Sequence, residues 1–279
     1  MSDLPERSPI ASAPISVILF AHALSTDTQD GLKAWRQFLD KINRPYEIFL
    51  IQETRPEIPP DPNLPPDAIT PSRTFSYDRS QGFREAIHSA IRSAQYPLVA
   101  FCTADKQYQP SDLDRLLSRI DTVDLVVGYR EGGEVPGWRS ALDSVLGVLS
   151  WTLLGLSLEA RPCWLGSEGW DRRWVAYWIF GVRVYDPECP FRLARREIFE
   201  CMPIQSGGAF FPVEVIAKAN HLGYYLTEEA VTWTPPTAPH EDAISFGDDA
   251  RLIFHDAEFA PPKAVTPPSE PPLADAPAA

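Results

Sequence analysis

Short, uninterrupted apolar runs alternate with segments of helical spacing along the first half of this chain, and this alternation restricts the fold more than any other feature. Four such runs are typical of strands buried on both faces of a sheet: Ile15–Phe20, Tyr46–Ile51, Leu98–Cys102 and Val123–Val127. Apolar residues recur at helical spacing over 28–42 and 81–94, and Ser111 is a good N-cap for a third helix. The pattern predicts an α/β fold, a mostly parallel central sheet with helices on both faces.

The remaining segments suggest how the chain is organised. Proline is too frequent over 56–71 for a strand, whereas 73–77 favours a short one. An apolar stripe predicts a helix over 138–158, and 211–222 and 224–233 favour a further helix and strand. We expect the following parts: a flexible leader over 1–14, one domain over 15–233 with a helical excursion at 138–180, and a largely disordered tail rich in proline, alanine and acids over 234–279.

Charge and cysteine content exclude several classes of protein. The formal net charge is −13, so the chain gains nothing from the phosphate backbone of nucleic acid, and we expect no nucleic-acid partner. The four cysteines show no C-x-x-C spacing, which argues against a zinc or redox motif. A secretory signal and an apolar run long enough to span a membrane are both missing from the pattern, which favours a cytoplasmic location.

Ligands of an open parallel sheet bind outside the carboxyl ends of its strands. Residues 21–25, 52–55, 103–107 and 128–130 follow the four apolar runs there. Asp105 stands just past a buried strand, with Thr103 and Gln107 two positions to either side. One carboxylate with neighbouring side-chain oxygens suits a hard cation that shares substrate phosphates. The alternative is a helix-capping loop with ordinary surface polar residues.

Seven segments in order resemble one known family. They are ISVILF; YEIFLI followed by Gln52 and Glu53; QGFREAIHSAI; TADKQYQPSDLDRLL; VDLVVGYRE; YDPECPFRLARREIFE; and FPVEVIAKANHLGYYLTEEAVTW. Over Ile15 to Trp233 the chain resembles the family 2 glycosyltransferases, and within them the polyprenyl-phosphate sugar transferases of the dolichyl-phosphate mannosyltransferase type. The resemblance implies a GT-A fold. It also implies transfer of a sugar, with inversion, from a nucleotide-diphosphate donor to a polyprenyl-phosphate or other glycosyl acceptor.

The resemblance further implies a site that uses a divalent cation, Mg²⁺ or Mn²⁺. Matching positions assign the nucleoside of the donor to Gln52 and Glu53, and the cation to Asp105 with Thr103 and Gln107. They assign a catalytic role near the acceptor and the cation to Asp186. A phosphate contact falls to Arg192, and a second acidic position to Glu214, for which a solvated helix carboxylate is the alternative. His22 follows the first strand and is a candidate donor contact or an ordinary loop histidine.

The chain departs from the family pattern at several of these positions. Ala21, His22 and Ala23 stand where the family has Asn-Glu after the first strand, and Thr103 replaces the first aspartate of the cation loop. A site with one acidic ligand holds a cation weakly without substrate phosphates. Two hypotheses therefore stand: a metal-assisted glycosyltransferase, and a glycosyltransferase-like protein that binds a nucleotide sugar but has lost turnover.

The apolar stripe over 138–158 also has two interpretations. In the polyprenyl-phosphate transferases the corresponding region lies against the membrane, and an interfacial helix pair here would place the protein on the inner face of the membrane. The alternative is a helical hairpin that packs on the sheet of the same chain or on a second subunit. In the second case the protein would be a homo-oligomer. Amphipathic character alone does not distinguish the two.

Overall fold

The computed structural model describes residues 9–21, 25–54, 71–78, 82–131, 184–208, 210–234 and 246–260. His22 and the excursion at 138–180 lie outside these ranges. Within them seven strands form a single sheet in the order β3-β2-β1-β4-β6-β5-β7. The strands are β1 (Ile15–Ala21), β2 (Tyr46–Thr54), β3 (Arg73–Asp78), β4 (Leu98–Thr103), β5 (Leu125–Glu131), β6 (Arg192–Arg195) and β7 (Leu226–Thr232).

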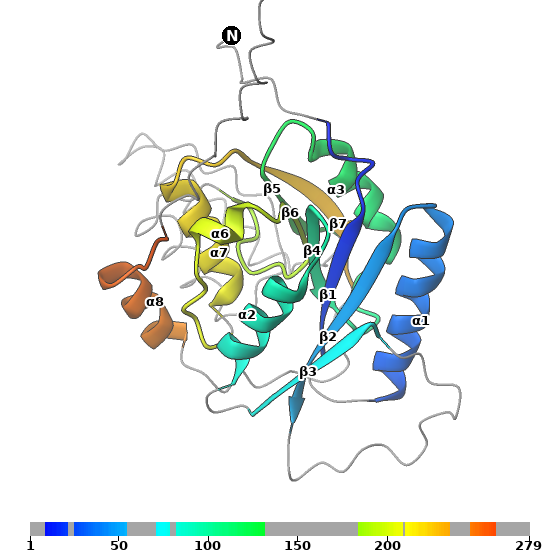
Figure 1. The fold of residues 1–279 in the computed structure, drawn as a ribbon, viewed down its shortest axis with the longest axis horizontal. Helices are drawn as coiled ribbons and strands as arrows, with labels where there is room; N and C mark the ends of the chain where they lie inside the picture. Colours follow the sequence, from blue (N-terminus) through cyan, green and yellow to red (C-terminus); the bar gives the residue numbers. More distant parts are fainter. Residues whose placement is uncertain are drawn as a thin grey trace, which may run out of the picture.

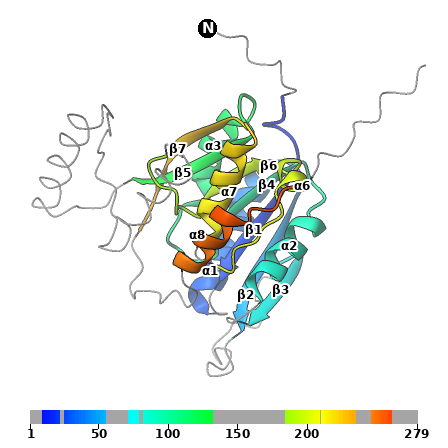
Figure 2. The same cartoon turned by 90° about the vertical axis from the view of Figure 1, so that its left-hand side faces the viewer.

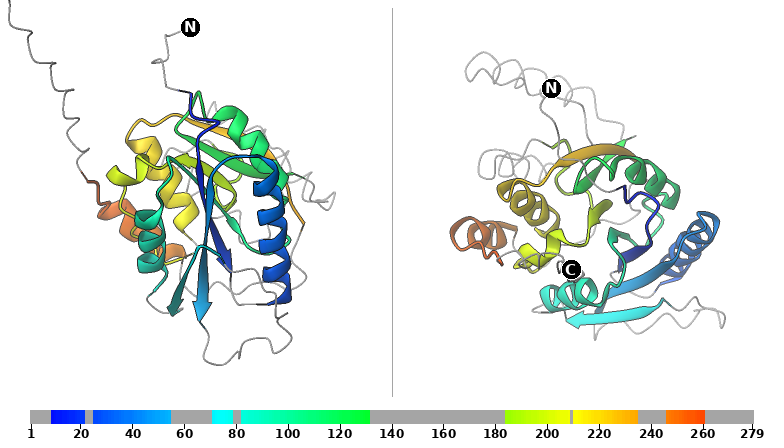
Figure 3. Two further views of the ribbon diagram at one scale, coloured as in Figure 1. Left: turned by 45° about the vertical axis from the view of Figure 1, so that its right-hand side comes forward. Right: turned by 45° about the horizontal axis from the view of Figure 1, so that its top comes forward.

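Helices cover both faces of this sheet, as Figures 1 and 2 show. One face carries α1 (Thr26–Lys41) and α3 (Leu113–Arg119), and the other carries α2 (Phe83–Ser93), α6 (Ile198–Cys201) and α7 (Phe211–His221). A further helix, α8 (Phe246–His255), lies on the outer side of α7 (Figure 3). Each face has its own buried apolar cluster, the first around Trp35 of α1 and the second around Ile87 of α2. The expected α/β fold with a mostly parallel sheet and helices on both faces is confirmed.

The apolar runs form the central strands, which are buried on both faces of the sheet. Every residue of β1 except Phe20, and every residue of β4 except Thr103, is buried, because helices cover both sides of these strands. The β1 register pairs Ala21 with Gln52 of β2, and Phe20 with Thr103 of β4. Since these strands are parallel, their carboxyl ends meet at one edge of the sheet.

Strand β6 departs from the parallel pattern. It runs antiparallel between β4 and β5, and pairs Arg192 with both Phe101 and Val127. The start of β6 therefore lies at the edge where β4 and β5 end. This brings the segment 186–191, which immediately precedes β6, to the same edge as the Asp105 loop, which we define as Thr103–Gln107.

The C-terminal part of the chain corrects one expectation. Residues 234–279 were expected to be largely disordered, yet α8 forms within them, and Ile253 of α8 is buried. The segment after α8 also returns to the body of the molecule, since the Ala260 amide donates to the Cys201 carbonyl over 3.1 Å. Within the described ranges, the helices are too short or too polar to cross a membrane.

Candidate functional site

The Asp105 loop places a carboxylate directly past the buried strand β4. Asp105 Oδ1 accepts hydrogen bonds from the Thr103 hydroxyl (2.6 Å) and from the Gln107 backbone amide (3.1 Å). Asp105 Oδ2 accepts one from Gln107 Nε2 (2.5 Å). The side chain is half-buried. Thr103, Asp105 and Gln107 are thus brought together, with the carboxylate as the shared acceptor, and their role as ligands of a cation stays a prediction.

The N-terminal half of α1 packs very closely on this loop. Ser25 caps α1 by accepting a hydrogen bond from the Thr28 amide. At Gly31 an added Cβ would lie 1.7 Å from the Ala104 carbonyl oxygen, so only glycine permits this approach. Lys106 of the loop also pairs with Asp27 (3.4 Å) and Asp30 (2.7 Å) of α1. Helix α1 therefore contacts the residues on both sides of Asp105, Ala104 by close backbone packing and Lys106 through exposed ion pairs.

Asp186 forms a buried ion pair with Arg130 at the same edge of the sheet. Arg130 Nε donates to Asp186 Oδ2 (2.5 Å) and Arg130 Nη2 to Asp186 Oδ1 (2.8 Å), which is a bidentate arrangement. The Asp186 side chain is 1% exposed and that of Arg130 is 18% exposed. Burial by itself would lower the pKa of Arg130, but the bond to Asp186 outweighs it, and the net effect raises that pKa. The guanidinium is therefore a permanent cation.

Trp233 connects this ion pair to the Asp105 loop. The carbon at the centre of the Arg130 guanidinium lies 5.4 Å from the centroid of the Trp233 ring. The indole N–H of Trp233 donates to Gln107 Oε1 (3.4 Å), and the next amide, that of Thr234, donates to the Gln107 carbonyl (2.8 Å). Asp105, Gln107, Trp233, Arg130 and Asp186 thus form one continuous series of contacts, which we call the edge network.

The geometry corrects one role that the resemblance implied, that of Arg192, and describes the surroundings of a second residue, Asp186. Arg192 was expected to contact a phosphate, but it is 1% exposed and donates to the backbone carbonyls of Cys189, Pro187 and Pro212. Burial lowers the pKa of Arg192 to about 10, so it remains charged at neutral pH while it ties the start of β6 to α7. Asp186 was expected to act near the acceptor; Arg130 occupies both of its oxygens, and the acceptor-side role stays a prediction. Arg130, the partner of Asp186, is 18% exposed at this edge.

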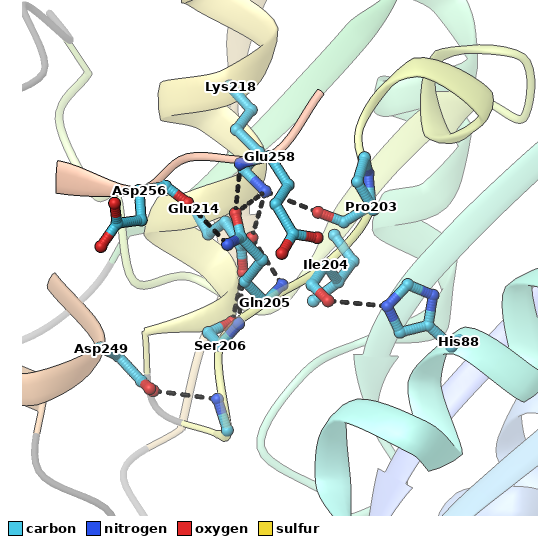
Figure 4. A network of polar contacts seen from close by, with 11 residues as sticks. His88, Pro203, Ile204, Gln205, Ser206, Glu214, Lys218, Asp249, Asp256 and Glu258 are labelled. Carbon is cyan, nitrogen blue, oxygen red and sulfur yellow. Dashed lines mark hydrogen bonds and ion pairs between the residues drawn. The ribbon is translucent and has the colours of Figure 1, made fainter. Parts of the chain in front are cut away.

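Glu214 lies away from this series, in a buried network beneath α8 (Figure 4). Its carboxylate accepts hydrogen bonds from the Gln205 and Ser206 amides and the Ser206 hydroxyl, and pairs with Lys218 at 2.8 Å. Lys218 also donates to the Pro203 carbonyl and to Gln205 Oε1. Both side chains are at most 1% exposed, which is incompatible with a solvated helix carboxylate. Glu214 organises the loop before α7.

The two residues assigned to the nucleoside lie at the end of β2. Gln52 is half-buried and pairs in register with Ser76 of β3, and Glu53 is 4% exposed. Both lie at the carboxyl edge of the sheet, two strands from β4 in the order β2-β1-β4. Their assignment to the nucleoside stays a prediction.

Sequence reasoning missed the importance of Arg130 and Trp233. Arg130 belongs to the group of residues that follows a buried strand, so its position was available, but a lone arginine there is not distinctive. Trp233 stands at the end of the last strand, and its approach to Gln107 depends on how β7 meets the Asp105 loop. Only the tertiary structure brings together side chains that are 126 positions apart.

The oxygen atoms in the Asp105 loop fit a cation only in part. Mg²⁺ and Mn²⁺ prefer oxygen ligands, and Mg²⁺ often takes one or two carboxylates together with substrate phosphates. Asp105 supplies one carboxylate, whose Oδ2 accepts a single hydrogen bond and so retains a lone pair. In the described ranges no three His, Cys, Asp or Glu side chains gather as a metal site. These residues fit a cation shared with phosphate oxygens, but not one held by the protein alone.

Comparison with curated proteins finds relatives of low identity. The chain is 26% identical over 159 residues to an uncharacterized glycosyltransferase of Mycobacterium bovis, and equally to one of Mycobacterium tuberculosis. The match covers 56% of this chain and 61% of each relative, so the chain spans about three fifths of their length. No protein-family model matches the chain.

Comparison with solved structures shows the fold. Glucosyl-3-phosphoglycerate synthase from Mycobacterium tuberculosis, crystallised with Mn²⁺, UDP-glucose and phosphoglyceric acid, matches with a TM-score of 0.53 at 15% identity, over 87% of this chain and 78% of that one. The same enzyme with Mg²⁺ and UDP matches with a TM-score of 0.52, over 87% of this chain and 77% of that one. The fold is thus that of a GT-A glycosyltransferase.

Proposed function

We propose that this protein is a glycosyltransferase that takes a sugar from a nucleotide-diphosphate donor. The observation that carries the proposal is the edge network, which places a carboxylate and an arginine cation at the carboxyl edge of the sheet. The glycosyltransferase names of the sequence relatives support the activity, and the UDP and UDP-glucose complexes of the structural neighbour make UDP-glucose the first donor to test.

The reaction would be a direct displacement. An oxygen of the acceptor forms a bond to the anomeric carbon, and the donor diphosphate leaves with the electron pair of the broken bond. Negative charge grows on the leaving diphosphate, and Arg130 supplies a fixed positive charge to oppose it. A divalent cation bound through Asp105 and the phosphates would add to this neutralisation. Asp186 holds the guanidinium in place.

The carboxylates of the edge favour an acceptor that is already ionised. Asp105 would bind the cation, and Arg130 occupies both oxygens of Asp186. Among the described residues of the edge network, this leaves no carboxylate as a general base. A phosphate oxygen attacks without losing a proton, whereas a hydroxyl needs a base. We therefore propose a polyprenyl phosphate as the acceptor, in preference to a hydroxyl acceptor.

The test measures UDP release from UDP-glucose with Mn²⁺, using a short-chain polyprenyl phosphate or phosphoglyceric acid as acceptor. We expect release with the polyprenyl phosphate, and a loss of about 100-fold in Asp105→Asn, the size of one electrostatic contact in a transition state. Asp114→Asn, an exposed carboxylate of α3, is the matched control and should keep full activity. Release with phosphoglyceric acid alone would contradict the acceptor but not the activity.

The second candidate is a nucleotide-sugar-binding protein without turnover. The observation in its favour is Thr103, which supplies a hydroxyl instead of a second carboxylate. That hydroxyl donates its hydrogen bond to Asp105. The same experiment separates the candidates when UDP binding is measured by calorimetry alongside release. Binding without release with any acceptor supports the second candidate, and no binding of UDP at all contradicts both.

A further inference from the structure

Trp233 contacts the Asp105 loop and the residue after it through its backbone as well as through its ring. Strand β7 pairs with β5 up to Thr232, which lies beside Glu131. The chain then forms an antiparallel bridge between Trp233 and Tyr108, and the Thr234 amide bonds to the Gln107 carbonyl. Just before it, the Thr232 amide donates to Asp112 Oδ2 over 2.6 Å. The indole is thereby held between the Asp105 loop and the end of β5.

The indole N–H and the Asp105 carboxylate together determine which way the Gln107 amide faces. Gln107 Oε1 accepts from Trp233, and Gln107 Nε2 donates to Asp105 Oδ2. An amide turned the other way would place its oxygen against the carboxylate oxygen and its NH₂ group against the indole N–H. Two acceptors would then face each other, as would two donors, and both arrangements are repulsive. Trp233 therefore acts through Gln107 on the oxygen of Asp105 that retains a lone pair.

The face of the same ring lies against Arg130. Asp186 holds the Nε and Nη2 edge of the guanidinium, and the indole limits its rotation out of that plane. Arg130 Nη1 has no hydrogen-bond partner among the residues described, and 18% of the side chain is exposed. The arrangement leaves Nη1 as the donor available to an anion.

We propose that Trp233 is a positioning residue of the donor site, which fixes the Gln107 amide through its N–H and the Arg130 guanidinium through its ring. The inference rests on the proposed function, because it concerns binding of the nucleoside diphosphate. It predicts that the two effects of Trp233 can be separated by substitution. Phenylalanine keeps a ring under Arg130 and lacks the N–H, whereas leucine lacks both.

The experiment measures UDP affinity by calorimetry with Mn²⁺. We expect Trp233→Phe to weaken UDP binding about fivefold, the size of one neutral hydrogen bond. Trp233→Leu should weaken it about 30-fold, because the contact with the cation is also lost. Trp35→Phe is the matched control, since Trp35 is buried in the same apolar cluster; it should lower the melting temperature and leave UDP affinity unchanged.

A double-mutant cycle distinguishes positioning from general packing. In a Gln107→Ala background, Trp233→Phe should change UDP affinity less than twofold, because the amide it orients is gone. The ¹⁵N resonance of the Trp233 indole should also move in Gln107→Ala without any ligand. Equal effects of Trp233→Phe in both backgrounds, or wild-type affinity in Trp233→Leu, would overturn the inference alone. If the wild type binds no UDP while the indole resonance still moves, the proposed function fails, and the role of Trp233 fails with it.

Discussion

At the scale of single residues, Asp105 and Asp186 show how two residues of the same type acquire different roles from their surroundings. Asp105 is half-buried and accepts hydrogen bonds from neutral groups, so its charge remains available to a cation. Asp186 is buried and faces a guanidinium, so its charge is already balanced. The sequence offered no way to tell them apart, because the partner of Asp186 is distant along the chain. Asp105 accepts from its neighbours Thr103 and Gln107, whereas Asp186 accepts from Arg130, 56 positions away.

The buried pair of Glu214 and Lys218 leads to a prediction about stability in which the effect of one substitution changes sign with the background. Removing one partner of a buried ion pair leaves an uncompensated charge and costs about 3 kcal/mol or more. We expect Lys218→Met to lower the free energy of unfolding by about that amount, and Glu214→Gln to lower it in the wild type. In Lys218→Met, adding Glu214→Gln should raise stability, because it removes the unpaired charge. Urea denaturation measures all four proteins.

The exposed pair Glu85–Arg92 is the control for this cycle. Its side chains are 76% and 65% exposed, and Glu85→Gln should change the free energy of unfolding by less than about 1 kcal/mol. If Glu214→Gln destabilises the protein equally with and without Lys218, the pair does not act as a buried ion pair.

Burial of the Cys189 thiol leads to a prediction about alkaline pH. Burial raises the pKa of Cys189 to about 12. The thiol of an unfolded chain has a pKa of about 8.5. Between about pH 8.5 and 12 the unfolded chain therefore binds fewer protons than the native one. Stability should therefore fall with rising pH, by up to about 1.4 kcal/mol per pH unit for this thiol. Cys189→Ser does not titrate here, and should show a shallower decline in urea denaturation between pH 8.5 and 10.5. Parallel curves for the two proteins would contradict the assignment.

At the scale of elements, the contact between α1 and the Asp105 loop depends on Gly31. Alanine normally stabilises a helix interior by about 1 kcal/mol relative to glycine. At Gly31 the added Cβ would collide with the Ala104 carbonyl, so helix or loop must move. We expect Gly31→Ala to lower the melting temperature and to weaken UDP binding, because Asp105 is the next residue after Ala104.

Ala34 on the exposed side of α1 provides the matched comparison. Ala34→Gly should lower the melting temperature through helix propensity alone and leave UDP affinity unchanged. A Gly31→Ala protein that is more stable than the wild type and binds UDP normally would show that the contact carries no strain.

The elements that sequence reasoning missed share a physical cause. Strand β6 is four residues long and begins and ends with arginine, so it shows neither an apolar run nor strict alternation. Its place between β4 and β5 is set by long-range pairing. Helix α8 was hidden by a composition typical of a tail, and it is anchored by contacts such as the Gly207 amide on Asp249 (3.0 Å). Local pattern cannot reveal an element that tertiary contacts stabilise.

At the scale of the whole molecule, the single carboxylate of the Asp105 loop predicts how ligands affect folding stability. A ligand that binds only the native state stabilises it by about 2.7 kcal/mol at 100 times its Kd. We expect Mn²⁺ alone to leave the melting temperature nearly unchanged, and Mn²⁺ with UDP to raise it by several degrees. The rise should disappear with EDTA and in Asp105→Asn. Equal stabilisation by Mn²⁺ with and without UDP would mean that the protein holds the cation by itself.

The sequence by itself determined the α/β class, the bounds of the central strands to within a few residues, and the position of Asp105 past a buried strand. These features follow from local periodicity, because a strand buried on both faces must be apolar throughout. Only the tertiary structure decided that Arg130 pairs with Asp186, that Arg192 and Glu214 are buried, and that Trp233 meets Gln107. The contacts of Arg130 with Asp186 and of Trp233 with Gln107 join residues 56 and 126 positions apart, which the sheet brings to one edge. No local periodicity can indicate such contacts.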